Sequence, residues 1–384
     1  MLFDKEYQSN LEARVFQEAR EMKEAGTKVV GVYCAFTPRE IISAAGALPV
    51  ALCAGGQKPI ERAEHHLPRV LCPLIKSSYG HALSDTCPYF HAADHLVADA
   101  TCDGKKKMFE LLDRIKPVHV LNLPQTSTGE ASLAYWMEEL TRLIPVLEAL
   151  TGQAVTDDAL REQIALHNAF RNKKKELCEL NRGPLPLVTG REVEAITGST
   201  MFDCNLEERI VEIDQALAEL KKRSGDESFL ASMKDKPRIL LTGCPTTNRK
   251  VFDIIEDSGA VVAAQENCGG LKTLSLSVAE EGDPLRAIAD RYLSIPCSCM
   301  TPNGARLDLI GELVRDYHID AVVELTWEAC HTYNVEAFQV QEFVKERCGL
   351  PYIQIRTDYS ENDSGQIRTR IEAFLEILAV RLAG

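Results

Sequence analysis

The sequence predicts an α/β protein in which two doubly wound parallel-sheet domains are joined by a helical segment. Short apolar runs alternate with helical patterns between residues 29 and 123, and the alternation returns from residue 238 to the C-terminus. The stretch between them has long amphipathic patterns instead. Apolar runs of about four to eight residues alternating with helices of about ten to fifteen are typical of βαβ units. The expected divisions are 1–127, 128–233 and 234–384.

The N-terminal division is expected to start with a charged helix and to continue as a Rossmann-like domain. Its short apolar runs predict strands at 29–34, 48–54, 95–102 and 117–123, with helices at 38–47, 74–85 and 104–115. The helical segment follows, with amphipathic patterns at 131–152 and 157–182 and a linker-like stretch at 224–237.

The C-terminal division repeats the pattern of the first. Its predicted strands are 238–244, 260–268, 320–330 and 350–355, and its predicted helices are 248–259, 284–294, 305–319, one from Val335 and a terminal one. Both halves therefore resemble versions of one α/β unit. In such folds a ligand binds in the crevice beyond the carboxyl ends of the strands.

Charge and hydropathy exclude several classes of partner. The 384 residues carry a net charge of −14, which repels nucleic acids and anionic lipid surfaces. The longest uncharged stretch, 41–57, is interrupted by Pro49 and three glycines and falls short of the roughly 20 apolar residues of a membrane span. The first 26 residues are charged at helical spacing and lack the apolar region of a secretory signal. We expect a cytoplasmic protein.

The thirteen cysteines are the unusual feature of the composition. In a reducing compartment, cysteine-rich chains more often bind metals or catalyse reactions than form disulfides. Seven cysteines fall at the end of a predicted strand or in a loop: Cys34, Cys72, Cys102, Cys244, Cys268, Cys297 and Cys330. Cysteines that only fill space would be scattered, as Cys178, Cys204 and Cys348 are. The clustering favours a shared site.

Two of these thiols precede predicted helices. Pro73 after Cys72 suits the first turn of a helix, and Asp103 after Cys102 is a plausible N-cap. A helix N-terminus lowers the pKa of a nearby thiol and favours the thiolate that metals require. Lys105, Lys106 and Lys107 add positive charge beside Cys102, although a solvated helix face also explains them.

The remaining candidates lie in loops of the second half. Cys330 is the counterpart of Cys102, and the adjacent His331 is a candidate proton donor, although such a histidine is as often structural. Gly269 after Cys268 lets backbone N–H groups approach a ligand. The loop between Pro296 and Pro302 holds Cys297 and Cys299, which are hard to explain by packing, whereas packing explains Cys53 and Cys87 equally well.

Missing motifs narrow the chemistry further. The chain has no Cys-x-x-Cys, which disfavours zinc ribbons, thioredoxin-type redox sites and compact ferredoxin-type clusters. It has no Gly-x-x-x-x-Gly-Lys-Ser/Thr loop and no clean Gly-x-Gly-x-x-Gly, so ATP and NAD are not expected by those routes. The remaining candidate is an iron–sulfur cluster that widely separated thiolates hold in the cleft between two domains.

The strings RVLCPLIKSSYG, ATCDGKKKM and EACHTY resemble the 2-hydroxyacyl-CoA dehydratase component-B family, and ENCGG, PCSCMTPN and Cys34 are most similar to its double-cubane cluster protein branch. In the dehydratases, the resemblance implies that Cys72, Cys102 and Cys330 hold one [4Fe–4S] cluster with an open iron. In the double-cubane branch, six cysteines hold two [4Fe–4S] cubanes bridged by a sulfide. The second set would come from Cys34, Cys268, Cys297 and Cys299, of which one is surplus.

The resemblance also implies a partner and a reaction. Family members receive single electrons from a separate ATP-hydrolysing [4Fe–4S] reductase, the activator, and a homodimer is expected. Our first hypothesis is a reductase component that reduces a small, hard-to-reduce molecule at a double-cubane cluster. The second is a 2-hydroxyacyl-CoA dehydratase subunit with one [4Fe–4S] cluster and a ketyl radical mechanism. A third is a non-catalytic electron carrier or cluster-storage protein.

Several polar residues beside the predicted ligands are auxiliary candidates. Glu266, like His331, is a candidate for proton supply by proximity, whereas Glu328 suits a surface ion pair better. The helix after Cys72 starts with Lys76, Ser77 and Ser78 near its first turn. These residues could donate hydrogen bonds to cluster sulfides or to substrate. An ordinary helix N-terminus explains them nearly as well.

Overall fold

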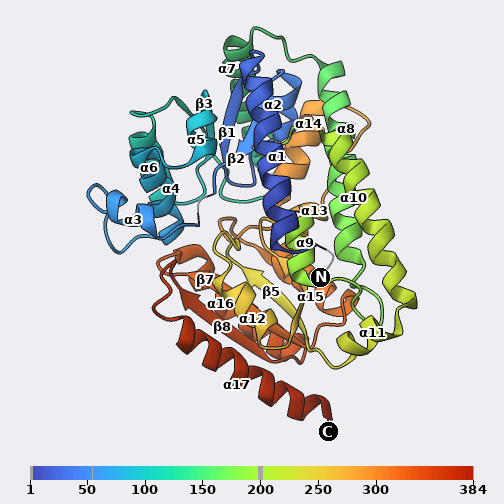
Figure 1. Cartoon of the computed structure of the whole chain (residues 1–384). Coiled ribbons are helices and arrows are strands. Elements are labelled where there is room, and N and C mark those ends of the chain that lie inside the picture. Colours follow the sequence, from blue (N-terminus) through green and yellow to red (C-terminus); the bar gives the residue numbers. More distant parts are fainter. Residues whose placement is uncertain (1–2, 54, 198–201, 384) are drawn as a thin grey trace.

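The computed structural model describes residues 3–53, 55–197 and 202–383, which form two four-stranded parallel sheets with flanking helices (Figure 1). The first sheet contains β1 (Val29–Tyr33), β2 (Leu48–Ala51), β3 (His95–Asp99) and β4 (Val118–Leu121). The second contains β5 (Arg238–Gly243), β6 (Val261–Glu266), β7 (Ala321–Trp327) and β8 (Tyr352–Thr357). The predicted α/β fold with two parallel-sheet domains is confirmed.

Both sheets have the same strand order. The orders are β2-β1-β3-β4 and β6-β5-β7-β8, and every neighbouring pair is parallel. The order reverses between β1 and β3 in the first sheet and between β5 and β7 in the second. Such a reversal opens a crevice at the carboxyl ends of the two strands, where doubly wound folds bind their ligands.

The helices flank the sheets and fill the segment between them. The N-terminal half has α1 (Lys5–Glu24), α2 (Arg39–Ala44), α3 (Lys58–Ala63), α4 (Pro73–Ser84), α5 (Pro88–Ala92) and α6 (Asp103–Leu112). The middle has α7 (Glu130–Thr151), α8 (Asp157–Glu179), α9 (Gly190–Thr197), α10 (Leu206–Lys221), a 3₁₀ turn (Lys222–Gly225) and α11 (Glu227–Lys234). The C-terminal half has α12 (Lys250–Asp257), α13 (Leu271–Leu274), α14 (Pro284–Leu293), α15 (Gly304–Asp316), α16 (His331–Glu342), a π turn (Phe343–Arg347) and α17 (Ser364–Ala383).

Two helix starts differ from the sequence prediction. Cys102 itself has the extended backbone of the N-cap of α6, so Asp103 is the first helical residue and not the cap. The helix predicted from Val335 begins at His331, with Cys330 at its N-cap. In both places a cysteine stands at the junction of loop and helix, so its thiol lies at the positive end of the helix dipole.

The C-terminal half does not pack on its own. Helix α14 contacts α7 and α8, and its Ile288 and Tyr292 belong to the same buried cluster as Trp136 of α7 and Val32 of the first sheet. Figure 1 shows α14 beside α2 and α8. The two halves are therefore joined by shared core as well as by the chain.

A buried polar contact ties this junction together. Arg171 of α8 forms an ion pair with Glu40 of α2, and the Tyr292 hydroxyl donates to the other Glu40 oxygen at 2.6 Å. Burial raises the pKa of Glu40, but Arg171 outweighs it with help from His167, so the pKa falls to about 2. The Glu40 carboxylate therefore stays ionised and holds three elements in place.

Among the described residues, no helix combines the length and the apolar character that crossing a bilayer requires.

Removal of Arg171 should weaken this junction. Arg171→Met leaves the Glu40 carboxylate buried without its cation, and we expect the free energy of unfolding to fall by about 3–5 kcal/mol in denaturant titrations. Arg20→Met is the matched control, because Arg20 is 64% exposed in its pair with the equally exposed Glu24 and should change stability by less than about 1 kcal/mol. Equal losses in both variants would contradict this account.

Candidate metal centre

One cavity of about 860 Å³ lies at the carboxyl ends of both sheets and collects most of the thiols of the chain. Nine of the thirteen cysteines line it: Cys34, Cys53, Cys72, Cys102, Cys244, Cys268, Cys297, Cys299 and Cys330. The seven cysteines given above as candidate ligands are among them: Cys34, Cys72, Cys102, Cys268, Cys297, Cys299 and Cys330. All thirteen cysteines are free thiols.

Six of the nine thiols occupy equivalent places in the two halves. Cys34 follows β1 and Cys244 follows the equivalent strand β5; Cys53 follows β2 and Cys268 follows β6; Cys102 follows β3 and Cys330 follows β7. Parallel strands end at the same edge of a sheet, so each half brings three thiols to its crevice. The cavity is therefore formed by two related sets of strand ends.

The backbone at these strand ends adopts a rare conformation. Cys34 has a φ of 89° and Ala329, just before Cys330, has a φ of 57°. Gly243, just before Cys244, has a φ of 102°, and a Cβ there would lie 2.2 Å from the Leu325 carbonyl oxygen. Non-glycine residues avoid positive φ, and such residues cluster at functional sites. The surrounding structure therefore keeps the turns that place these thiols in an otherwise unfavourable backbone conformation.

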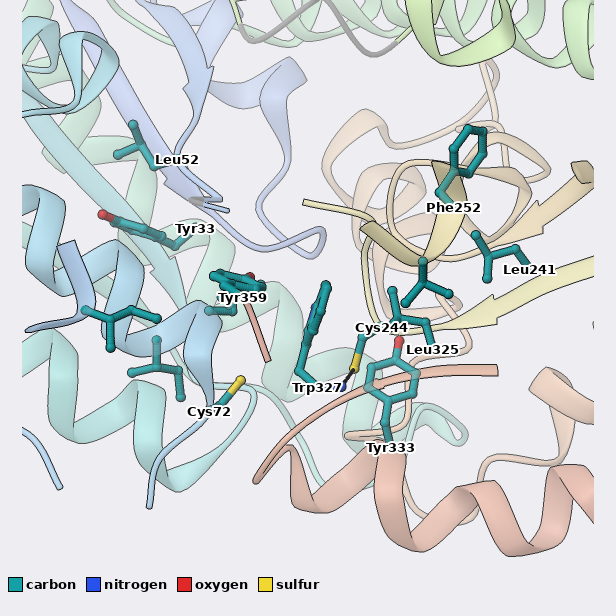
Figure 2. Close-up of a cluster of buried hydrophobic side chains, with 14 of the residues drawn as sticks. Tyr33, Leu52, Cys72, Leu241, Cys244, Phe252, Leu325, Trp327, Tyr333 and Tyr359 are labelled. Atoms are coloured by element: carbon teal, nitrogen blue, oxygen red, sulfur yellow. Dashed lines mark hydrogen bonds between the residues drawn. The ribbon is translucent and has the colours of Figure 1, made fainter. Parts of the chain in front are cut away.

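The first group of interacting thiols consists of Cys72, Cys244 and Cys330. Figure 2 shows Cys72 and Cys244 near Trp327, where the halves meet. The thiols of Cys244 and Cys72 donate to the sulfur of Cys330, which lowers the pKa of Cys330 to about 3. The hydrogen bond to Cys330 raises the pKa of Cys72. The pKa of Cys244 is raised mainly by burial and further by its own hydrogen bond to Cys330. The group therefore favours one thiolate stabilised by two thiols.

The second group contains Cys34, Cys268, Cys297 and Cys299. The thiol of Cys299 donates to the sulfur of Cys297 and lowers the pKa of Cys297 to about 6. The same hydrogen bond raises the pKa of Cys299. Burial raises the pKa of Cys34, and that of Cys268 to about 12. Cys102, placed by the resemblance with Cys72 and Cys330, interacts electrostatically with the nearby Lys105.

The donor set suits an iron–sulfur cluster better than a single ion. Among the described residues, no three cysteine, histidine or acidic side chains converge closely enough to hold one metal ion. A cubane needs thiolates spread around it, one at each ligated iron, and soft thiolates are the ligands that such clusters use. Nine thiols distributed around one cavity fit that requirement.

Three polar residues of α4 do not face the cavity. The Lys76 ammonium donates to Glu64 at 2.9 Å and to the Arg69 carbonyl at 2.8 Å, and the Ser77 hydroxyl donates to the Gly56 carbonyl at 2.7 Å. The Ser78 hydroxyl is buried without a hydrogen bond among the described residues, and it too lies outside the cavity lining. The cofactor-binding role predicted for these side chains has no support from their positions, because the helix turns them into the protein.

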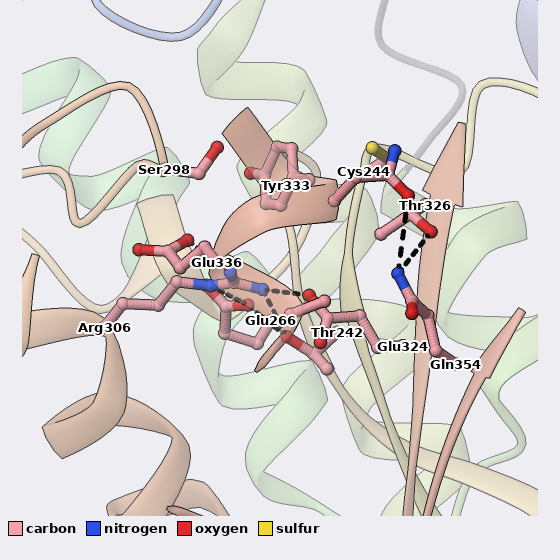
Figure 3. Close-up of polar contacts among 12 residues, drawn as sticks. Thr242, Cys244, Glu266, Ser298, Arg306, Glu324, Thr326, Tyr333, Glu336 and Gln354 are labelled. Atoms are coloured by element: carbon pink, nitrogen blue, oxygen red, sulfur yellow. Dashed lines mark hydrogen bonds and ion pairs between the residues drawn. The ribbon is translucent and has the colours of Figure 1, made fainter. Parts of the chain in front are cut away.

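Glu266 is held in a buried ion network and does not line the cavity. Its carboxylate pairs with Lys272 at 2.9 Å and with Arg306 at 3.2 Å. Figure 3 shows Glu266 and Arg306 below Tyr333. Burial raises the pKa of Glu266, but Arg306 and Lys272 outweigh it and keep the pKa below its ordinary value. An ionised carboxylate has no proton to give, so its position does not support the proton-donor role predicted from proximity.

His331 and Gly269 do line the cavity. His331 is exposed at the first residue of α16, next to Cys330, so its imidazole stands where the cavity meets solvent. The Gly269 N–H donates to the Asn267 side chain at 3.0 Å and is already engaged. Of the two, His331 is the one whose side chain lies at the edge of the cavity.

Sequence reasoning left two lining cysteines out of the candidate ligand set. Cys244 was grouped with the strand-end thiols but given no role, and Cys53 was attributed to packing. The signal that identifies them is the correspondence between halves: Cys244 is the counterpart of Cys34, and Cys53 that of Cys268. That correspondence requires the strand order, which the sequence does not state.

Comparison with known proteins gives matches along nearly the whole chain. The Escherichia coli protein YjiM, provisionally named as a dehydratase subunit, is 42% identical over 365 residues, which cover 94% of each chain. The (R)-phenyllactyl-CoA dehydratase beta subunit of Clostridium sporogenes is 22% identical over 368 residues, again 94% of each chain. A benzoyl-CoA reductase subunit of Thauera aromatica is 24% identical over 364 residues, 92% of this chain and 91% of the relative.

The match to a family as a whole is equally extensive. Residues 34–378 match the family of the 2-hydroxyglutaryl-CoA dehydratase D-component. The matched range includes all nine cysteines of the cavity. Its relatives include both dehydratase and reductase subunits, so the chain is an enzyme component. The chain belongs to the 2-hydroxyglutaryl-CoA dehydratase D-component family.

Proposed function

We propose that this protein is an iron–sulfur reductase component that reduces a small, hard-to-reduce molecule at a double-cubane cluster. The observation that carries the proposal is the set of nine thiols around one cavity. A single [4Fe–4S] cluster with an open iron needs only three protein ligands, so the cavity offers more sulfur than one cluster uses. The relative named as a benzoyl-CoA reductase subunit is consistent with reductive chemistry.

The proposed ligands come from both halves of the chain. Following the family resemblance, Cys72, Cys102 and Cys330 would hold one cubane. Three thiols among Cys34, Cys268, Cys297 and Cys299 would hold the other. When bound, such a cluster supplies electrons of low potential and an iron at which a substrate can bind.

The side chains of the protein shape the cavity, keep water from part of it and provide a proton source. Apolar side chains such as Leu74 and Ile75 line the cavity beside Cys72, and Trp327 packs next to Cys244. These groups keep water from the buried Cys72 and Cys244, which favours a low reduction potential and protects this part of the site from side reactions. The His331 imidazole at the exposed edge can take a proton from solvent and hold it next to the cavity.

The electrons would come from a separate protein. Relatives of this chain are beta subunits of dehydratases, which supports a component that works with partners. We propose an ATP-hydrolysing [4Fe–4S] reductase as the activator and a homodimer as the working form, in the cytoplasm. ATP hydrolysis on the partner would drive the conformational change that delivers an electron below ordinary potentials.

A dehydratase subunit is the second candidate. It is favoured by relatives whose names describe (R)-phenyllactyl-CoA and (R)-2-hydroxyglutaryl-CoA dehydratase subunits, at 22% and 20% identity. In that case Cys72, Cys102 and Cys330 would hold a single [4Fe–4S] cluster, and the substrate would be a 2-hydroxyacyl-CoA. The remaining thiols of the cavity would then have no ligand role.

Metal analysis separates the two candidates. Strictly anaerobic protein should contain about eight irons and about nine acid-labile sulfides per chain, because two [4Fe–4S] units and a bridging sulfide require them. Colorimetric iron and sulfide assays, with electron paramagnetic resonance after low-potential reduction, measure this. About four irons per chain would instead support the single-cluster dehydratase.

Ligand variants test the second cubane directly. Cys268→Ala removes a thiol of the second group, and the iron content should fall towards about half of the wild-type value. Cys178→Ala is the control, because Cys178 is buried in α8 outside the cavity lining. Iron is measured per folded chain after the same anaerobic reconstitution. An unchanged iron content in a set of single variants at Cys34, Cys268, Cys297 and Cys299 would remove the second cubane.

Turnover distinguishes the substrate classes. With an ATP-dependent activator of this family, we expect reduction of small unsaturated molecules, and a loss of rate of about tenfold or more when a non-hydrolysable analogue replaces ATP. A panel of 2-hydroxyacyl-CoA thioesters, each with and without a second dehydratase subunit, should give no dehydration by chromatographic assay. Dehydration of a thioester would favour the second candidate over the first.

A further inference from the structure

Lys105 is a buried cation that faces the thiols of the cavity. It lies on α6, three residues after Cys102, and is only 9% exposed. It shares the buried face of α6 with Met108, Phe109 and Leu112, whereas the next two residues, Lys106 and Lys107, are exposed. Of the three consecutive lysines, Lys105 is therefore the one that the fold turns inward.

Lys105 has no counter-charge of its own in the part of the chain that the structure describes. In residues 3–53, 55–197 and 202–383, its ammonium group has no hydrogen bond to an oxygen within 3.5 Å and no ion pair within 4.0 Å. The carboxyl group that acts electrostatically on Lys105 is that of Asp99, at the end of β3. The two Asp99 oxygens accept instead from the Phe36 N–H at 2.8 Å and from the Thr37 hydroxyl at 2.7 Å.

The second half contains a buried lysine, Lys272, whose charge is neutralised by a carboxylate. Lys272 is fully buried, pairs with Glu266 at 2.9 Å and donates to the Tyr333 hydroxyl at 2.7 Å. Tyr333 stands three residues after Cys330, as Lys105 stands three residues after Cys102, so the two side chains hold equivalent places. One half thus has a lysine–tyrosine contact with a carboxylate partner at this place, and the other has a lysine without such a partner that lines the cavity together with the thiols.

The surroundings of Lys105 are thiols from both halves. Its ammonium group interacts electrostatically with Cys34, Cys53 and Cys102 of the N-terminal half. It also acts on three thiols of the C-terminal half, Cys268, Cys297 and Cys299. Lys105 lines the cavity, so an anionic group bound there would supply the counter-charge that the described residues do not. Thiolates and sulfides of a bound cluster are anionic and would meet the three N–H donors of the lysine.

We propose that Lys105 is the counter-charge of the bound cluster, which it holds by donating to anionic sulfur and whose reduction potential it raises. The inference rests on the proposed iron–sulfur function. Reduction adds negative charge to a cluster that is already anionic, and a cation in a poorly solvated site stabilises the reduced form. Lys105 is a positioning residue: it acts on the cluster through charge and supplies no ligand to iron.

The test separates the effect of the positive charge of Lys105 from the effect of the shape of its side chain. Lys105→Met removes the charge and keeps an unbranched side chain, whereas Lys105→Arg keeps the charge. Lys107→Met is the matched control on the same helix, because Lys107 is 72% exposed and pairs with Glu110. Each full-length variant is reconstituted anaerobically, assayed for iron and sulfide, and titrated electrochemically while the reduced cluster is followed by electron paramagnetic resonance.

We expect Lys105→Met to need a more negative potential for reduction. At a fixed potential its ratio of reduced to oxidised cluster should fall about tenfold or more, which corresponds to about 59 mV for one electron. The reduction potentials of Lys105→Arg and Lys107→Met should both stay close to that of the wild-type protein. A fully loaded Lys105→Met protein with the wild-type potential would overturn the inference.

Failure to load has a defined meaning as well. If folded Lys105→Met binds no iron while Lys105→Arg loads normally at the wild-type potential, the charge is required to hold the cluster, which supports the inference. If neither variant loads although both are folded, the requirement is for the shape of lysine, and the counter-charge role is wrong. Wild-type protein without iron would instead remove the proposed function, a result that the iron assay separates from all the others.

Discussion

The parallel direction of every strand is the constraint on which the site depends. Parallel strands end at one edge of their sheet, and the same strand order in both halves brings two equivalent edges to one cavity. Each edge places a cysteine just beyond the first, second and third strands of its unit. The thiols come from distant positions in the sequence and still share one cavity, because the topology fixes where strand ends meet. Short sequence motifs for cluster binding are therefore unnecessary.

Buried ion pairs keep the two halves in register around this cavity. Glu40, Arg171 and Tyr292 join α2, α8 and α14, which belong to three different parts of the chain. Within the second half, Arg306 contacts Glu266 and Glu324, which lie on different strands of the second sheet, and so holds that sheet together. Removing one partner from such a pair leaves an uncompensated charge, so these networks resist small displacements. A site assembled from two domains needs that resistance to keep its ligands at fixed separations.

The thiols make this rigidity chemically useful. One member of each group, Cys330 and Cys297, has a lowered pKa because neighbouring thiols donate to its sulfur. Desolvation opposes charge at all the other members whose pKa is raised, so a bound metal cluster would complete the deprotonation. Lys105 and Lys272 offset part of the negative charge that results. The balance between buried sulfur and buried lysine is the property that would set how easily an electron enters.

The sequence by itself determined the α/β class, the duplicated unit and the strand-end and loop cysteines that line the cavity, because apolar periodicity and the position of a residue in a loop or after a strand are local properties. It also placed Cys330 as the counterpart of Cys102. Only the tertiary structure decided which thiols interact, that Cys53 lines the cavity, that Cys244 contacts Cys330, and that Lys76, Ser77, Ser78 and Glu266 turn away from the cavity. It alone separated Lys105 from Lys106 and Lys107. Those outcomes depend on strand order, helix phase and contacts between residues far apart in the chain, which periodicity does not record.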